Sequence, residues 1–96
     1  MIRVVKLSFK EQHIDEFKQF FESRKERIRN AEGCTHLELW QDNSSPGIFY
    51  TYSLWEEVQY LEQYRTSALF HDTWSIVRQW FGEKPEAFST TKLTTA

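Results

Sequence analysis

The chain has 96 residues, a formal net charge of −2 and an isoelectric point near 5.9. This length makes a single domain, residues 1–96, because a second core would have too little chain to bury it. The mildly acidic balance argues against a nucleic-acid partner, Cys34 as the only cysteine excludes an internal disulfide, and no apolar run approaches the ~20 residues that cross a bilayer. We therefore expect a cytoplasmic protein with no membrane partner.

Apolar periodicity predicts a strand and then a long helix in the first third of the chain. Residues 2–9 alternate as a strand, with Val5, Leu7 and Phe9 on one face and Ile2 and Val4 on the other. Residues 11–30 have the helical period, and their apolar stripe consists of Ile14, Phe17, Phe20, Phe21 and Ile28. The helix then ends at Gly33.

The rest of the chain predicts two more strands, a broken helix and a last strand. Residues 34–41 and 48–54 alternate as strands, and the polar segment 42–47 forms the turn between them. Ser53 and Glu56 have the spacing of a capping box, which predicts a short helix directly after the second of these strands. Another helix begins near Ser67 and ends before Gly82, and the threonine-rich residues 87–94 suit a strand.

This order of elements predicts an α+β domain with the ferredoxin-like βαββαβ arrangement. Such a chain closes as a four-stranded antiparallel sheet with its helices on one face. The other face is covered either by water or by another subunit. The polarity of the residues on that face indicates which of these covers it.

Neither face of the predicted sheet is polar throughout. In strand 48–54 one face carries Ile48, Tyr50, Tyr52 and Leu54, and the other carries Phe49, with Trp55 just beyond. In strand 34–41 one face carries Leu37 and Leu39, and the other carries Cys34, His36 and Trp40. An antiparallel sheet with a bare face normally alternates apolar and polar residues. We therefore expect a homodimer packed sheet to sheet.

Three short motifs resemble the antibiotic-biosynthesis-monooxygenase domain, a family of the dimeric α/β-barrel group. They are the Gly-Cys opening of a strand at Gly33-Cys34, the strand-end Trp55, and a Ser-x-x-Phe segment from Ser67 to Phe70. The resemblance covers essentially the whole chain. It implies a homodimer that forms an α/β barrel, with a pocket between the helices and the sheet of each subunit. The family includes cofactor-free oxygenases of quinols and polycyclic phenols, heme-degrading enzymes, and members without known activity.

The chain departs from this family at several positions. Where many members have a Glu two residues before the strand-end Trp and a His nine residues after it, this chain has Ser53 and Tyr64, and Leu69 replaces a second frequent His. The Asn, Trp and His of the heme-degrading branch align best with Val5, Tyr64 and Trp74, so that triad is absent. We expect no heme degradation, and the quinol-oxidising assignment is weakened. No metal or other cofactor is expected, because the three His residues are scattered and no carboxylate cluster accompanies them.

Two histidines are the candidate catalytic bases. His71 lies near the start of the last helix and could face the pocket or be exposed in the first helical turn. His36 lies in a strand beside Trp40 and could contact a ligand or be a hydrogen-bonded interface residue. The candidate substrate-binding residues are aromatic, each with an alternative place in the core or interface: Tyr50, Tyr52, Trp55, Tyr64 and Trp74.

Two functions of different class follow from these residues. The first is a cofactor-independent monooxygenase of a quinol or phenolic substrate, in which the deprotonated ring transfers an electron to O₂ inside a closed apolar cavity. The second is a non-catalytic dimeric domain that binds a small hydrophobic molecule. The family's missing Glu and His positions favour the second function.

Overall fold

Four strands form one antiparallel sheet in the computed structural model, which describes residues 1–96. They are β1 (Ile2–Ser8), β2 (Cys34–Gln41), β3 (Ile48–Trp55) and β4 (Glu86–Thr90). Their spatial order is β2-β3-β1-β4, with β1 paired to both β3 and β4. This is the ferredoxin-like architecture predicted from the sequence.

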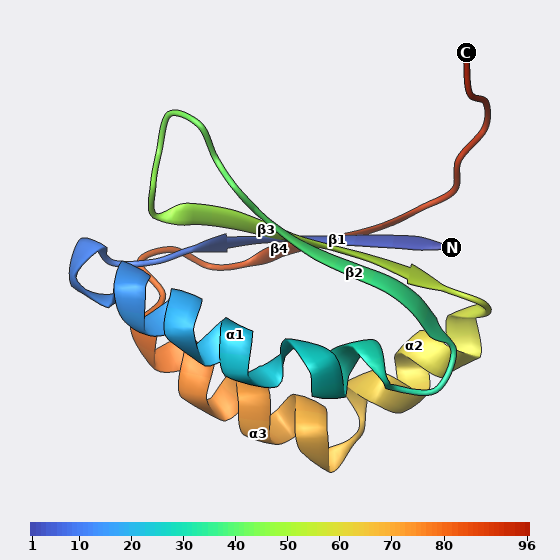
Figure 1. Cartoon of the computed structure of the whole chain (residues 1–96), viewed down its shortest axis with the longest axis horizontal. Coiled ribbons are helices and arrows are strands. Elements are labelled where there is room, and N and C mark those ends of the chain that lie inside the picture. The colour runs from blue at the N-terminus through green and yellow to red at the C-terminus, as the bar shows by residue number, and fades with distance from the viewer.

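The helices all lie on one side of this sheet (Figure 1). They are α1 (Ile14–Arg29), α2 (Val58–Arg65) and α3 (Ala68–Val77), with short 3-10 turns η1 (Glu11–His13) and η2 (Arg78–Trp80). The backbone of α1 packs close to β2, whereas α3 has its nearest backbone neighbours in α1, α2 and η2. Side chains therefore span the space between α3 and the sheet. None of the helices combines the length and the hydropathy that crossing a membrane requires.

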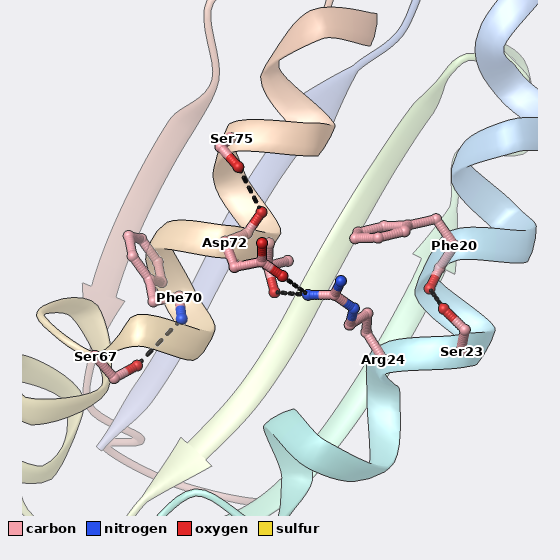
Figure 2. A network of polar contacts seen from close by, with 8 residues as sticks. Phe20, Ser23, Arg24, Ser67, Phe70, Asp72 and Ser75 are labelled. Carbon is pink, nitrogen blue, oxygen red and sulfur yellow. Dashed lines mark hydrogen bonds and ion pairs between the residues drawn. The ribbon is translucent and has the colours of Figure 1, made fainter.

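The starts of the two short helices differ in how well the sequence predicted them. The predicted helix start near Ser67 is confirmed, and Ser67 caps α3: its Oγ accepts a hydrogen bond from the backbone N–H of Phe70 at 3.1 Å (Figure 2). The predicted capping box at Ser53 is wrong. Ser53 is buried within β3, and α2 begins only at Val58, after Glu57, with no side-chain cap.

The predicted alternation of faces is confirmed in β1 and β3 and fails at one end of β2. A β-bulge lies between Cys34 and His36, so that Cys34 pairs with Trp55 while His36 pairs with Leu54. The extra residue turns Cys34 to the helix side of the sheet, where it is buried against Trp55 and Leu61. The prediction that Cys34 shares a face with His36 was therefore wrong. A period of two cannot reveal an inserted residue.

The apolar core consists of two clusters on the helix side of the sheet. The larger contains Leu7, Phe9, Phe17, Phe49 and Val77. The rings of Phe9 and Phe17 stack at a centroid distance of 4.1 Å, and Phe49 meets Phe17 edge to face at 5.0 Å. The smaller contains Cys34, Trp55 and Leu61. The space between the two clusters is the candidate site.

Gly33 lets α1 turn back into β2. Its φ of +80° lies in the left-handed region, and a Cβ at this position would be 2.2 Å from Cγ of Tyr60. Only glycine fits both the backbone and the ring packed against it.

Candidate functional site: a cavity between helices and sheet

A cavity of about 310 Å³ lies between the helices and the inner face of the sheet. Fourteen of its 22 lining residues are hydrophobic, so its walls are mainly apolar. Its volume is at the lower end of the range for small-molecule sites, which suits a ligand of a few rings. Residues of both core clusters line it, among them Leu7, Phe17 and Val77 from the larger one and Trp55 and Leu61 from the smaller one.

One side of the cavity is a continuous row of four rings, here called the aromatic wall: Trp55, Tyr64, Phe70 and Trp74. Tyr64 stacks on Trp55 at 5.4 Å and meets Phe70 edge to face at 5.2 Å. Phe70 in turn lies 5.5 Å from Trp74. Three of the five aromatic residues proposed from the sequence as binding groups, Trp55, Tyr64 and Trp74, thus lie together along this cavity.

Trp55 is fixed in place by the serine that stands where many family members have a glutamate. The indole N–H of Trp55 donates to Oγ of Ser53 at 3.0 Å, and both side chains are buried. The hydrogen bond satisfies the only polar atom of the indole, so the ring keeps one orientation. Ser53 therefore supports the aromatic wall. Its hydroxyl cannot serve as a general base, as a carboxylate could.

Tyr64 lines the cavity and has an unpaired hydroxyl. Its phenol makes no hydrogen bond within the protein, although the ring is held between Trp55 and Phe70. Burial, with a smaller effect from negative charge at Cys34, raises the pKa of Tyr64 to about 12. At neutral pH the group is therefore a neutral phenol, able to donate a hydrogen bond to a ligand oxygen.

The raised pKa of Tyr64 predicts a loss of stability at alkaline pH. The unfolded chain releases this proton near pH 10 and the folded chain near pH 12, so the stabilising contribution is complete below pH 10 and falls away as pH rises to 12. Two pKa units correspond to about 2.7 kcal/mol. Urea unfolding across this range should show a steeper fall for the wild type than for Tyr64→Phe. Tyr50→Phe, on the outer face, is the matched control, and equal slopes in Tyr64→Phe and wild type would contradict the assignment.

Tyr50 and Tyr52 lie on the outer face of the sheet, away from the helices. Successive strand residues alternate, and Ser53, which lines the cavity, fixes the tyrosines on the opposite face. Neither of these two candidate substrate-binding residues therefore lines the cavity. Tyr52 instead stacks on Trp40 at 4.9 Å, which suits the interface role that was the alternative.

Neither candidate histidine lines the cavity. His36 is exposed on the outer face, where its Nε2 hydrogen-bonds the carboxylate of Glu38. His71 is exposed on α3, because the helix turns Phe70 and Trp74 toward the sheet and His71 outward. The expected placement of a histidine in a cavity within one subunit is thus not observed. Any catalytic role of His71 or His36 stays a prediction.

Four arginines that the sequence analysis did not propose line the cavity instead: Arg3, Arg24, Arg65 and Arg78. No aspartate, glutamate or histidine lines it. A signal was present in the sequence, since Arg3 shares the inward face of β1 with Val5 and Leu7, and Arg24 lies four residues before Ile28 on the apolar stripe of α1.

Arg24 joins α1 to α3 across the cavity roof (Figure 2). Its Nη1 donates to Oδ2 of Asp72 at 2.7 Å and to Oγ1 of Thr73 at 3.2 Å, and its guanidinium lies 4.7 Å from the ring centroid of Phe20. These contacts satisfy the charge within the protein and hold the two helices together. Arg24 is therefore a structural cation.

The remaining reactive groups offer little chemistry. Burial raises the pKa of the Cys34 thiol, partly offset by a hydrogen bond with the backbone of His36 and by the positive charge of Arg29, so the reactive thiolate is disfavoured. No group of three or more His, Cys, Asp or Glu side chains gathers where a metal ion could be held. The expected absence of a cofactor stays a prediction.

The fold and cavity define a class: a small ferredoxin-like domain with an aromatic cavity between its helices and its sheet. The family model of antibiotic biosynthesis monooxygenase matches residues 1–74, and the chain belongs to this family. No curated protein matches the sequence.

Solved structures share the fold at low sequence identity. A Nitrosomonas europaea protein named for the same monooxygenase family is 17% identical, with a TM-score of 0.88 over 97% of this chain and 98% of its own. A structure named antibiotic biosynthesis monooxygenase is also 17% identical, with a TM-score of 0.88 over 98% of this chain and 100% of its own. A conserved protein from Methanosarcina mazei Go1 is 25% identical, with a TM-score of 0.83 over 91% of this chain and 87% of its own.

Proposed function

We propose that this protein binds a small aromatic molecule in its cavity and oxygenates it without a cofactor, the substrate being a quinol or phenol. The observation that carries the proposal is the aromatic wall, whose Tyr64 makes no hydrogen bond through its hydroxyl, in a chain of the antibiotic biosynthesis monooxygenase family. Flat rings surrounded by aromatic side chains lose their contact with water, and a hydroxyl on the ring finds a neutral donor.

The reaction needs no external reductant. A hydroquinone and O₂ give a hydroxyquinone and water: one oxygen atom forms a new bond to ring carbon, and the other leaves as water with the two hydrogens that the ring loses. The ring anion first transfers one electron to O₂, the two radicals combine, and loss of water from the resulting peroxide yields the product. The substrate itself supplies every electron.

The residues of the cavity would serve the anionic form of the substrate. The hydrogen bond from the Tyr64 hydroxyl stabilises a phenolate oxygen, and the arginine charges lower the pKa of a bound phenol. With no base lining the cavity, the proton leaves to solvent, or the substrate binds as the anion. The aromatic wall excludes water from the radical pair.

One observation favours a second candidate function, a non-catalytic domain that binds a small hydrophobic ligand. No histidine or carboxylate lines the cavity, so a general base, usually worth about 10²-fold or more in rate, is missing from it. Under this alternative the cavity binds the same class of molecule and leaves it unchanged.

Oxygen uptake with a panel of hydroquinones, measured beside calorimetric binding, separates the two functions. An oxygenase consumes O₂ in proportion to hydroxyquinone formed, and Tyr64→Phe should slow turnover by about 10-fold or more while leaving the ring bound. A loss of about 10²-fold in His71→Ala or His36→Ala would instead identify that histidine as the base. Binding without oxygen uptake in the wild type would establish the second function.

We also propose that the protein is a homodimer formed through the outer face of the sheet. Apolar and aromatic side chains occupy most of this face on the two central strands, namely Ile2 and Val4 on β1 and Ile48, Tyr50, Tyr52 and Leu54 on β3. The charged exception is Lys6 on β1, which pairs with Glu86 on β4. Trp40 and Phe88 flank them with 41% and 50% of their surface exposed. Large rings left in water on a contiguous apolar face are typical of a subunit interface.

A further inference from the structure

Arg3 occupies a position on the sheet where an apolar residue would be expected. It lies in the central strand β1 on the inward face, on the same side as Val5 and Leu7. Its cross-strand neighbours are Ser53 on β3 and Ser89 on β4. A short polar row therefore crosses the inner face of the sheet beside a cavity whose walls are mainly apolar.

The guanidinium of Arg3 has no anionic partner in the protein. Its Nη1 donates to Oγ of Ser89 at 2.9 Å, and this is its only hydrogen bond, although a guanidinium has five N–H donors. No carboxylate lies within ion-pair distance of it. Most donors of this guanidinium are thus free, and the cavity that Arg3 lines contains no acidic side chain.

The surroundings of Arg3 are positive and partly desolvated. Burial, followed by the positive charge of Arg65, lowers the pKa of Arg3, and Glu62 only partly opposes this. Arg65 itself lines the cavity and is 3.8 Å from Glu62, at the outer limit of an ion pair. A bound anion would supply the negative partner that Arg3 lacks in the protein.

The other two arginines of the cavity are already engaged. Arg24 is paired with Asp72, and Nε of Arg78 donates to the backbone carbonyl of Trp74 at 3.3 Å. Among the cavity arginines, Arg3 alone has neither a carboxylate partner nor a contact with a helix carbonyl.

We propose that the cavity takes an aromatic carboxylate, whose ring lies against the aromatic wall and whose carboxylate pairs with Arg3. The planar guanidinium matches the two oxygens of a carboxylate, which favours this group over a single phenolate oxygen. The inference rests on the proposed function only for the use of the cavity as a ligand site. It adds the acid group by which the substrate is recognised and oriented.

The alternative role for Arg3 is to cover apolar surface with its stem while its head reaches water. Under that role a ligand's charge would make no difference to binding. Matched pairs of acid and amide with the same rings therefore separate the two roles: benzoate with benzamide, and 2-naphthoate with 2-naphthamide.

The test is isothermal titration calorimetry of both pairs on wild type, Arg3→Gln, Arg3→Lys and Arg27→Gln. Wild type should bind at least one acid about 10-fold or more tightly than its amide, since a charge-assisted contact is being compared with a neutral one. Arg3→Gln should abolish the preference and Arg3→Lys should keep part of it. Arg27→Gln removes an exposed charge that does not line the cavity and should bind as the wild type does.

Each remaining result overturns a different statement. Equal binding of acid and amide by the wild type, or an undiminished preference in Arg3→Gln, would overturn the carboxylate site while leaving the aromatic cavity intact. Failure of every acid and amide to bind a wild type that binds hydroquinone would overturn this inference alone, whereas failure of hydroquinone as well would overturn the ligand cavity of the proposed function. Arg3→Lys provides the comparison if Arg3→Gln does not fold, because loss of the fork with retention of the charge should still weaken the acid selectively.

Discussion

Replacing Phe49 by alanine should lower the free energy of unfolding by about 3–5 kcal/mol. Phe49 is 1% exposed, lies in the central strand β3, and meets the rings of Phe9 and Phe17 edge to face at 5.9 and 5.0 Å. Truncation removes apolar burial and leaves a hole that the two neighbouring rings cannot easily close. Against a typical total of about 5–15 kcal/mol, the loss would leave a marginal fold.

Urea unfolding at one fixed protein concentration measures this loss, because a dimer couples unfolding to dissociation. Leu93→Ala is the control, since Leu93 is 94% exposed in the tail after β4 and its removal should change stability by no more than about 0.5 kcal/mol. Because Phe49 does not line the cavity, the stability change in Phe49→Ala reports the packing of the core. A change below about 1 kcal/mol in Phe49→Ala would show that this ring is not at the centre of the core.

The architecture was predictable because hydrophobic period and element order agree along most of the chain. Alternation separated Phe49 from Tyr50 and Tyr52, and helical spacing put Phe17 on the apolar stripe of α1, but neither pattern told which face of the sheet meets the helices. The predictions failed where a tertiary contact overrode a local pattern. Ser53 has capping-box spacing, yet its hydroxyl binds the indole of Trp55 within the sheet.

The candidate site was predictable only in part, because a residue's type does not tell which way it points. Trp55, Tyr64 and Trp74 line the cavity, whereas the strand period carries Tyr50 and Tyr52 to the other face. Arg3 was missed because a charged residue in an apolar strand is usually taken to face water. Arg3 is two residues from Val5, and this spacing predicts that both lie on the inward face of β1. In a strand with clear alternation, spacing predicts the face better than residue type does.

A charge placed at Val4 should convert a dimer into monomers. Val4 lies on the outer face of β1, between Tyr52 of β3 and Phe88 of β4, so it occupies the middle of the surface through which we propose that two subunits meet. Two copies of Val4→Glu would bury unpaired carboxylates near each other, which typically costs several kcal/mol and weakens association by more than about 10²-fold. Because Val4 points away from the helices, the core of each subunit should stay intact.

Light scattering at micromolar concentration is the measurement, beside the far-ultraviolet circular dichroism that reports folding. Wild type should have twice the chain mass of 11.6 kDa, and Val4→Glu should have that mass once with an unchanged spectrum. Lys18→Glu, which alters an exposed position on α1, should remain dimeric. A stable dimer of this kind should bury the ~1,200–2,000 Å² that is typical of stable interfaces. We expect Tyr50 and Tyr52 at the centre of the interface and His36 and Glu38 near its rim. A wild type that scatters as 11.6 kDa would mean that the rings of Trp40, Tyr52 and Phe88 stand in water, and the sheet-to-sheet dimer would have to be abandoned.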